Sequence, residues 1–166
     1  MDQLRSRLYK GLDVLLPLAN RVGTHLYVEN IPFAFLPDAD GLMRALDDYG
    51  AEDIGIVYDI ANAVFIKEDL AAGFRRVRER LRLVHLSDTG HRIYRHDSIG
   101  RGVVPFTTVP PMLREVGYAE LPMLEIISPA ADADIRHSAD QLIAMGWGEE
   151  KPASRSTAAV DRLGQS

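Results

Sequence analysis

The chain has 166 residues, 46% of them hydrophobic, which suffices for one globular domain with a core and is too short for two ordinary domains. Its formal net charge is −5, and no run of Lys and Arg is long enough to follow a phosphate backbone, which argues against nucleic acid as a partner. The absence of cysteine excludes disulfides and thiolate metal sites, so any metal must be held by carboxylates and imidazoles. Residues 1–10 lack the continuous apolar stretch of a signal peptide or membrane span, so we expect a soluble, cytoplasmic protein without a membrane partner.

The first predicted elements are a helix over residues 5–22, followed by a strand over residues 25–29. Pro17 is expected to kink or interrupt this helix, and Gly23 stands where it would stop. A second helix, with Asp38 or Asp40 as its cap and Gly50 as its stop, precedes an apolar strand over residues 54–59. The helical spacing of the first element is carried by five apolar residues, Leu8, Leu12, Leu15, Ala19 and Val22.

The same helix and strand unit repeats twice more. A helical face from Leu70 to Leu81 precedes a strand over residues 82–86, and a helix over residues 109–116 precedes a strand over residues 121–126. A last helix is predicted from about residue 133 to 145. We therefore expect one domain over residues 1–147 and a disordered polar tail over residues 148–166.

Strands that alternate with helices, each nearly continuously apolar, indicate an α/β fold with a parallel sheet covered by helices. A complete (β/α)₈ barrel needs about 250 residues. Four such units therefore predict a partial (β/α)₈ TIM barrel made of its C-terminal half. A small open doubly wound sheet is the alternative architecture.

Each predicted strand carries a residue that can bind a metal at its C-terminal side: Glu29, Asp59, His85 and Glu125. Taken singly, a carboxylate at a strand end is more often a helix cap or a surface residue, and a histidine is more often buried and hydrogen-bonded. In parallel barrels, however, the C-terminal ends of neighbouring strands meet at one mouth, where catalytic groups lie. The coincidence on four strands favours a shared site.

These residues lie in motifs that resemble those of the xylose isomerase-like barrels, a family that includes sugar phosphate isomerases and epimerases, inosose dehydratases and the endonuclease IV type of abasic-site nuclease. The similarity runs in order over roughly residues 5–146, so only the C-terminal half of that barrel is matched. Five segments carry it: Leu26-Tyr27-Val28-Glu29-Asn30, Tyr58-Asp59-Ile60-Ala61-Asn62-Ala63, Val84-His85-Leu86-Ser87-Asp88, His96-Asp97-Ser98-Ile99-Gly100-Arg101-Gly102 and Leu124-Glu125-Ile126.

The resemblance implies that Glu29, Asp59, His85 and Glu125 bind one divalent metal ion. Three carboxylates and one imidazole suit Mn²⁺, Co²⁺, Mg²⁺, Fe²⁺ or Zn²⁺. It also implies that Glu29 and Glu125 are catalytic as acid and base on opposite faces of a ketose or related polyol, moving a proton next to its carbonyl. The expected function is that of a sugar or sugar phosphate isomerase or epimerase of carbohydrate metabolism, in a truncated form.

Four further residues are candidates for substrate binding: Asn62, His96, Arg95 and Arg101. His96 precedes Gly100 and Gly102, whose conformational freedom lets a loop turn tightly near a ligand. Asp88 either orients His85 or caps this loop.

Three alternatives stay open. An inosose dehydratase-like lyase would use the same metal and proton abstraction, and a non-catalytic half-barrel would pair with a partner, for example as a homodimer through exposed sheet edges. The abasic-site nuclease is disfavoured, because the resemblance places histidine and aspartate ligands of an extra zinc site where this chain has Asn62 and Tyr94.

Overall fold

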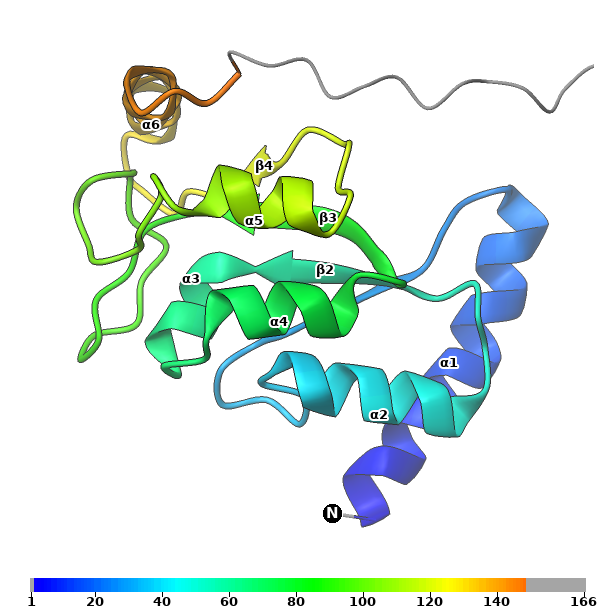
Figure 1. Cartoon of the computed structure of the whole chain (residues 1–166). Helices are drawn as coiled ribbons and strands as arrows, with labels where there is room; N and C mark the ends of the chain where they lie inside the picture. The colour runs from blue at the N-terminus through cyan, green and yellow to red at the C-terminus, as the bar shows by residue number, and fades with distance from the viewer. Residues whose placement is uncertain (1, 149–166) are drawn as a thin grey trace, which may run out of the picture.

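The computed structural model describes residues 2–148 of the chain as an α/β arrangement around a four-stranded parallel sheet (Figure 1). The predicted tail over residues 148–166 lies almost wholly outside the described residues. The elements, in chain order, are α1 (Asp2–Val22), β1 (Tyr27–Glu29), α2 (Ala39–Tyr49), β2 (Gly55–Asp59), α3 (Ile60–Phe65), α4 (Leu70–Val77), β3 (Leu81–Leu86), α5 (Val109–Glu115), β4 (Met123–Leu124) and α6 (Ala131–Ala144).

The strands pair in the order in which they occur in the chain, β1-β2-β3-β4, and every pair is parallel. Figure 1 shows α2, α4 and α5 side by side over one face of this sheet. That arrangement is the outer helical layer and the strand layer of a barrel over half of its circumference. It leaves β1 and β4 as the two edges of the sheet.

The helical layer packs on the sheet through a core of side chains that alternate along the strands. Tyr58 of β2 is fully buried, with its ring centroid 5.0 Å from that of Phe74 on α4. Gly73 makes this approach feasible, because a Cβ there would lie 2.0 Å from the Tyr58 hydroxyl oxygen. The Tyr58 hydroxyl donates to Glu68 (2.9 Å), which also accepts the N–H of Ala39 at the start of α2 (3.0 Å).

The predicted boundaries of the second helix are confirmed. The Asp38 side chain accepts the N–H of Gly41 as the N-cap of α2, and Gly50 ends the helix with a left-handed φ of 82° while donating to the Leu46 carbonyl. Pro17 was predicted to kink or interrupt this helix, and the interruption is wrong, because α1 is helical from Asp2 to Val22. Pro17 is exposed, so water can bond the carbonyl that its missing N–H leaves free.

The outer strands are shorter than the sequence predicted, since β1 has 3 residues and β4 has 2. Each has a hydrogen-bonded neighbour on one side only, and this limits how far the ladder extends. The short helix α3 was not predicted. It begins directly after β2, where the Asp59 side chain accepts the N–H of Asn62 at 2.7 Å.

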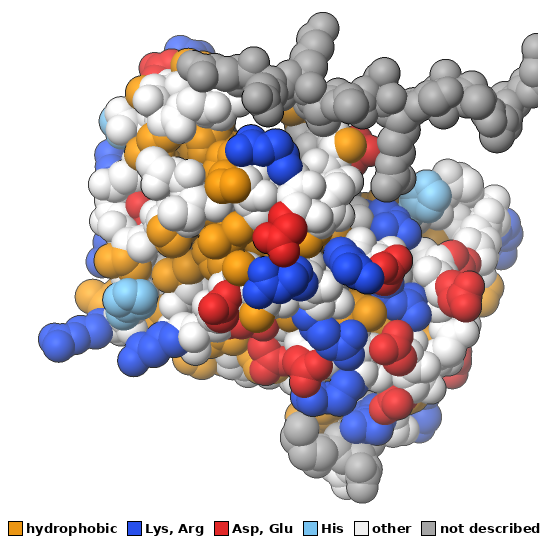
Figure 2. Space-filling model, in the orientation of Figure 1, with side chains coloured by type: hydrophobic (Ala, Val, Ile, Leu, Met, Phe, Trp, Pro, Cys, Tyr) orange, Lys and Arg blue, Asp and Glu red, His pale blue; other side chains and the backbone are white. Residues whose placement is uncertain are grey.

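Charges of both signs are interspersed on the helical face of the molecule, as Figure 2 shows. Asp40 pairs with Arg76 at 2.8 Å and Asp47 with Arg80 at 3.3 Å. Such exposed pairs contribute little to stability, typically about 0–1 kcal/mol each. No helix within residues 2–148 combines the length and the apolar composition that crossing a membrane requires.

Candidate metal centre

The four strands bring the four predicted ligands to one end of the sheet. Glu29 and Asp59 are the last residues of β1 and β2, His85 is the penultimate residue of β3, and Glu125 directly follows β4. Asp59 and His85 are register partners in the β2–β3 ladder. One ligand atom from each residue lies within 4.8 Å of those of the other three.

The contacts within this cluster leave acceptors without donors. His85 Nδ1 lies 3.1 Å from Glu29 Oε1 and 3.2 Å from Glu125 Oε2. Asp59 Oδ2 and Glu125 Oε2 are buried and accept no hydrogen bond from the protein. Buried carboxylate oxygens need a compensating cation or proton, so the donor set and its two orphaned oxygens fit a divalent metal ion.

The cluster also shifts the proton affinity of its members. The pKa of Asp59 is raised to about 8, above all by burial and additionally by the negative charges of Glu125 and Glu29, against the lowering effect of the hydrogen bond from the Asn62 N–H. Burial by itself lowers the pKa of His85, but the hydrogen bond to Glu29 and the neighbouring carboxylates outweigh it and raise that pKa. The metal-free cluster therefore retains protons that a bound cation would replace.

Asn30 fixes the position of Asp59, although the sequence indicated no role for it. Its side chain accepts the N–H of Asp59 (2.8 Å) and donates to the Asp59 carbonyl (3.0 Å), which ties the loop after β1 to the end of β2. Asn30 is completely buried. In the sequence Asn30 stands only as the neighbour of Glu29, because a contact across 29 residues leaves no trace in sequence spacing.

A series of hydrogen bonds connects Asn30 with His96 through Asn62 and Tyr94, and the donor of each bond can be assigned. The Asn62 side chain donates to the Asn30 carbonyl (2.8 Å), so its own oxygen accepts the Tyr94 hydroxyl (2.8 Å). Burial and the cluster carboxylates raise the pKa of Tyr94 to about 12, which keeps this hydroxyl protonated. The Tyr94 hydroxyl donates its only proton to Asn62. In the 2.8 Å contact with His96 Nε2 the histidine N–H is therefore the donor and the Tyr94 oxygen is the acceptor. His96 Nδ1 then faces Ser87 Oγ (3.1 Å) and Glu125 Oε2 (3.2 Å).

Asp88 organises the loop that carries Tyr94 and His96. Its carboxylate, in a residue only 1% exposed, accepts backbone N–H bonds from four residues along the loop: Thr89 (3.0 Å), Gly100 (2.9 Å), Gly102 (2.8 Å) and Val104 (3.1 Å). A Cβ at Gly102 would meet the Thr89 carbonyl oxygen at 2.3 Å. Of the two roles considered for Asp88, capping the loop is the one that these contacts describe.

The other candidate substrate residues lie farther from the cluster or have partners inside the protein. Arg101 pairs with Asp134 of α6 at 3.0 Å. The exposed Arg95 guanidinium lies 3.8 Å from Asp97. The side-chain N–H and the side-chain oxygen of Asn62 are both hydrogen-bonded within the protein, so this side chain positions neighbouring residues.

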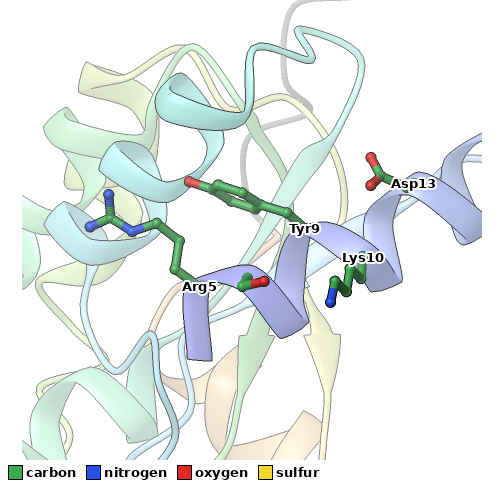
Figure 3. Close-up of a pocket in the computed structure, with 5 residues that line it drawn as sticks. Arg5, Tyr9, Lys10 and Asp13 are labelled. Carbon is green, nitrogen blue, oxygen red and sulfur yellow. The ribbon is translucent and has the colours of Figure 1, made fainter. Parts of the chain in front are cut away.

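One hollow on the described surface lies away from this cluster. It has a volume of about 370 Å³ and is lined by α1 alone, through Arg5, Ser6, Tyr9, Lys10 and Asp13. Figure 3 shows Arg5 and Tyr9 pointing toward α2, where they bond Asp48 and the Ala45 carbonyl. This hollow contains no member of the cluster at the strand ends.

The chain belongs to the xylose isomerase-like TIM barrel family, whose model matches residues 2–145. The prediction of a partial barrel is thereby confirmed. No curated protein matches the chain.

Solved structures with a similar fold include several enzymes. 3-Keto-D-glucoside 4-epimerase YcjR from E. coli, in its apo form, has a TM-score of 0.71 and 22% identity over 84% of this chain and 53% of its own. The probable 3-DHS dehydratase AsbF from Bacillus anthracis has a TM-score of 0.72 and 12% identity, with 86% and 58% covered. The IOLI protein with a bound zinc atom has a TM-score of 0.67 and 15% identity, with 85% and 57% covered. The chain thus spans little more than half the length of these proteins, and identities this low show the fold alone.

Proposed function

We propose that the chain carries the metal centre of a sugar isomerase or epimerase that moves a proton next to a carbonyl group. The observation that supports this most directly is the convergence of Glu29, Asp59, His85 and Glu125, with two buried carboxylate oxygens left without donors. The similarity in fold to a sugar epimerase and to a zinc-containing protein agrees with it.

The four residues would hold one divalent ion, which would supply the positive charge that stabilises negative charge developing on the substrate oxygen. Glu29 and Glu125 come from the two edge strands, on either side of Asp59 and His85. We propose that one glutamate removes the proton from the carbon next to the carbonyl and the other returns one from the opposite face. Asp59, held by Asn30 and Asn62, keeps its place while these protons move.

Substrate hydroxyl groups would be bound beside this centre. His96 is the best placed of the candidate residues, because its Nδ1 lies 3.2 Å from Glu125 Oε2. We propose Arg95 and Arg101 for contacts to the remote end of a sugar or polyol. Each guanidinium would then bind the substrate while it keeps its ion pair, with Asp97 and Asp134 respectively.

A related lyase is the second candidate, favoured by the similarity in fold to a probable dehydratase. It would use the same proton abstraction and then expel water, so product analysis on a panel of ketoses separates the two reactions. A nuclease with further zinc ions is disfavoured. The Tyr94 hydroxyl bonds Asn62 Oδ1 and His96 Nε2, at 2.8 Å each, so neither atom is free to bind an ion.

The metal centre is tested by titrating the chain with Mn²⁺ or Co²⁺ and measuring binding by calorimetry. We expect one ion per chain, and His85→Ala should weaken binding by at least about 10-fold, since even loss of a residue that only supports a ligand costs that much. Glu68→Gln is a matched control, because Glu68 is a half-buried carboxylate outside the cluster. Equal affinity in His85→Ala and the wild type would contradict the proposed centre.

The roles of the two glutamates are tested in a complete barrel that contains this half. Glu29→Gln and Glu125→Gln should each slow hydrogen exchange between solvent and the substrate carbon by about 10²-fold or more, the usual contribution of an acid or base group. Metal affinity should fall much less, because the amide oxygen still reaches the ion. Unchanged exchange in both variants would rule out proton transfer by these side chains.

A further inference from the structure

Three aromatic rings from separate segments meet near the proposed metal centre. Phe33 follows β1, Phe65 ends α3, and Tyr94 lies in the loop after β3. Their ring centroids are 5.5 Å (Phe33–Phe65), 5.8 Å (Phe33–Tyr94) and 5.2 Å (Phe65–Tyr94) apart, with Phe33 edge-on to both partners. We call these three residues the aromatic wall.

The backbone at Phe33 is in a conformation that favours glycine. Ala34 N–H bonds the Ile31 carbonyl at 3.1 Å, Pro32 occupies the second position of this turn, and Phe33 at the third has a φ of 66°. This pattern is that of a type II turn, whose third position usually requires glycine or asparagine. Phe33 is also 81% exposed, so burial of its ring does not offset this strain. A costly, exposed ring beside a candidate site indicates function.

The wall is joined to the metal cluster through His96. The Tyr94 and His96 rings are 5.3 Å apart, and the His96 imidazole contacts Glu125 Oε2 at 3.2 Å. In this series of contacts Phe33 touches Tyr94, and Tyr94 touches His96. A sugar with its reacting carbons at the cluster would meet the His96 side of the wall first, which leaves the exposed Phe33 ring for a further unit of the substrate.

We propose that the aromatic wall binds a second ring joined to the reacting sugar by a glycosidic bond, so that the natural substrate is a glycoside and not a free monosaccharide. This rests on the proposed function and deepens it. The face of such a ring presents C–H groups, which pack on aromatic rings, while its hydroxyl groups stay in water at the rim. Ile31 and Ile93, which neighbour Phe33 and Tyr94 in the sequence, are exposed as well.

The test measures binding of phenyl β-D-glucoside and methyl β-D-glucoside to the Zn²⁺-loaded chain by ligand-observed NMR. We expect the phenyl glucoside to bind about five-fold more tightly, the size of one aromatic contact. Phe33→Gly should abolish this preference without lowering the unfolding temperature, because glycine accepts the positive φ. Phe33→Tyr should keep the preference. The matched control is Leu121→Gly, which removes another exposed apolar side chain, before β4, and should leave the preference for the phenyl glucoside unchanged.

The results separate the competing explanations. Equal binding of the two glycosides, no binding of either, or a preference that survives Phe33→Gly would overturn the proposal. A Phe33→Gly chain whose mass in light scattering differs from the wild type would also overturn it, because the ring would then belong to a protein interface. Failure of the chain to bind Zn²⁺ would contradict the proposed metal centre. The two glycosides would then be compared on the metal-free chain, and a preference for the phenyl glucoside there would still support the aromatic wall.

Discussion

Asp88→Ala is expected to lower the free energy of unfolding by about 4 kcal/mol, because a buried carboxylate that accepts four backbone N–H groups would be lost. The N–H groups of Thr89 and Val104 are in buried residues and would have no acceptor, while those of Gly100 and Gly102 are more exposed and can bond water. Urea unfolding followed by circular dichroism measures the change. Since a small domain has only about 5–15 kcal/mol in total, the loop should lose its fixed shape.

Two variants make this result specific. Asp97→Ala is the matched control: this side chain is only partly buried and has a distant ion pair with Arg95, so the loss should be within about 0.5 kcal/mol. Asp88→Asn keeps one acceptor oxygen and should fall between the two. A loss below about 1 kcal/mol for Asp88→Ala would mean that water replaces the carboxylate and that the loop does not depend on it.

The isolated chain is expected to associate and to have little epimerase activity. Its edge strands have unpaired backbone groups, and beside them lie exposed apolar side chains, with exposed fractions of 38% for Tyr27, 46% for Met123 and 84% for Leu121. We propose that two copies pair β4 of one with β1 of the other, which would close eight strands. The pocket loops would then be duplicates of those already present, and a reacting group displaced by about 1 Å loses ~10²-fold in rate.

Light scattering and an assay of ketose epimerisation with Mn²⁺ or Co²⁺ test this directly. We expect the mass of two chains or more, and turnover more than about 10²-fold below that of a full-length epimerase of this family. Leu121→Lys should weaken the association by placing a charge at the edge, whereas Val14→Lys on the exposed surface of α1 should not. A monomer with enzyme-like turnover would show that four strands suffice.

The sequence predicted those parts of the fold that depend on local chemistry. The cap at Asp38 and the stop at Gly50 were found because capping involves neighbours three or four residues away. The four candidate ligands could be predicted because each lies at the C-terminal side of a predicted strand, and parallel strands present these ends together. The short helix α3 was not predicted because its cap, Asp59, is also the last residue of β2, so no loop separates strand from helix.

What the sequence could not predict depends on contacts between distant residues. Asn30 supports Asp59 from 29 positions away, and Tyr94 reaches Asn62 across 32. Phe33 is a different case, because the pair Pro32-Phe33 gives no sign of a positive φ when glycine is absent. Such positions require the folded backbone before their strain, and the reason for it, can be recognised.

The order of the sheet would also determine when this protein acquires the metal affinity that we propose. Each strand pairs with the next one along the chain, so the sheet can grow by adding one strand at a time, with only the helix-containing segment between neighbouring strands to close. The ligands are distributed one to each strand end, and the last of them, Glu125, arrives only with β4. Partly folded chains would therefore offer an incomplete set of ligands, and cation binding during refolding would report the docking of the final strand.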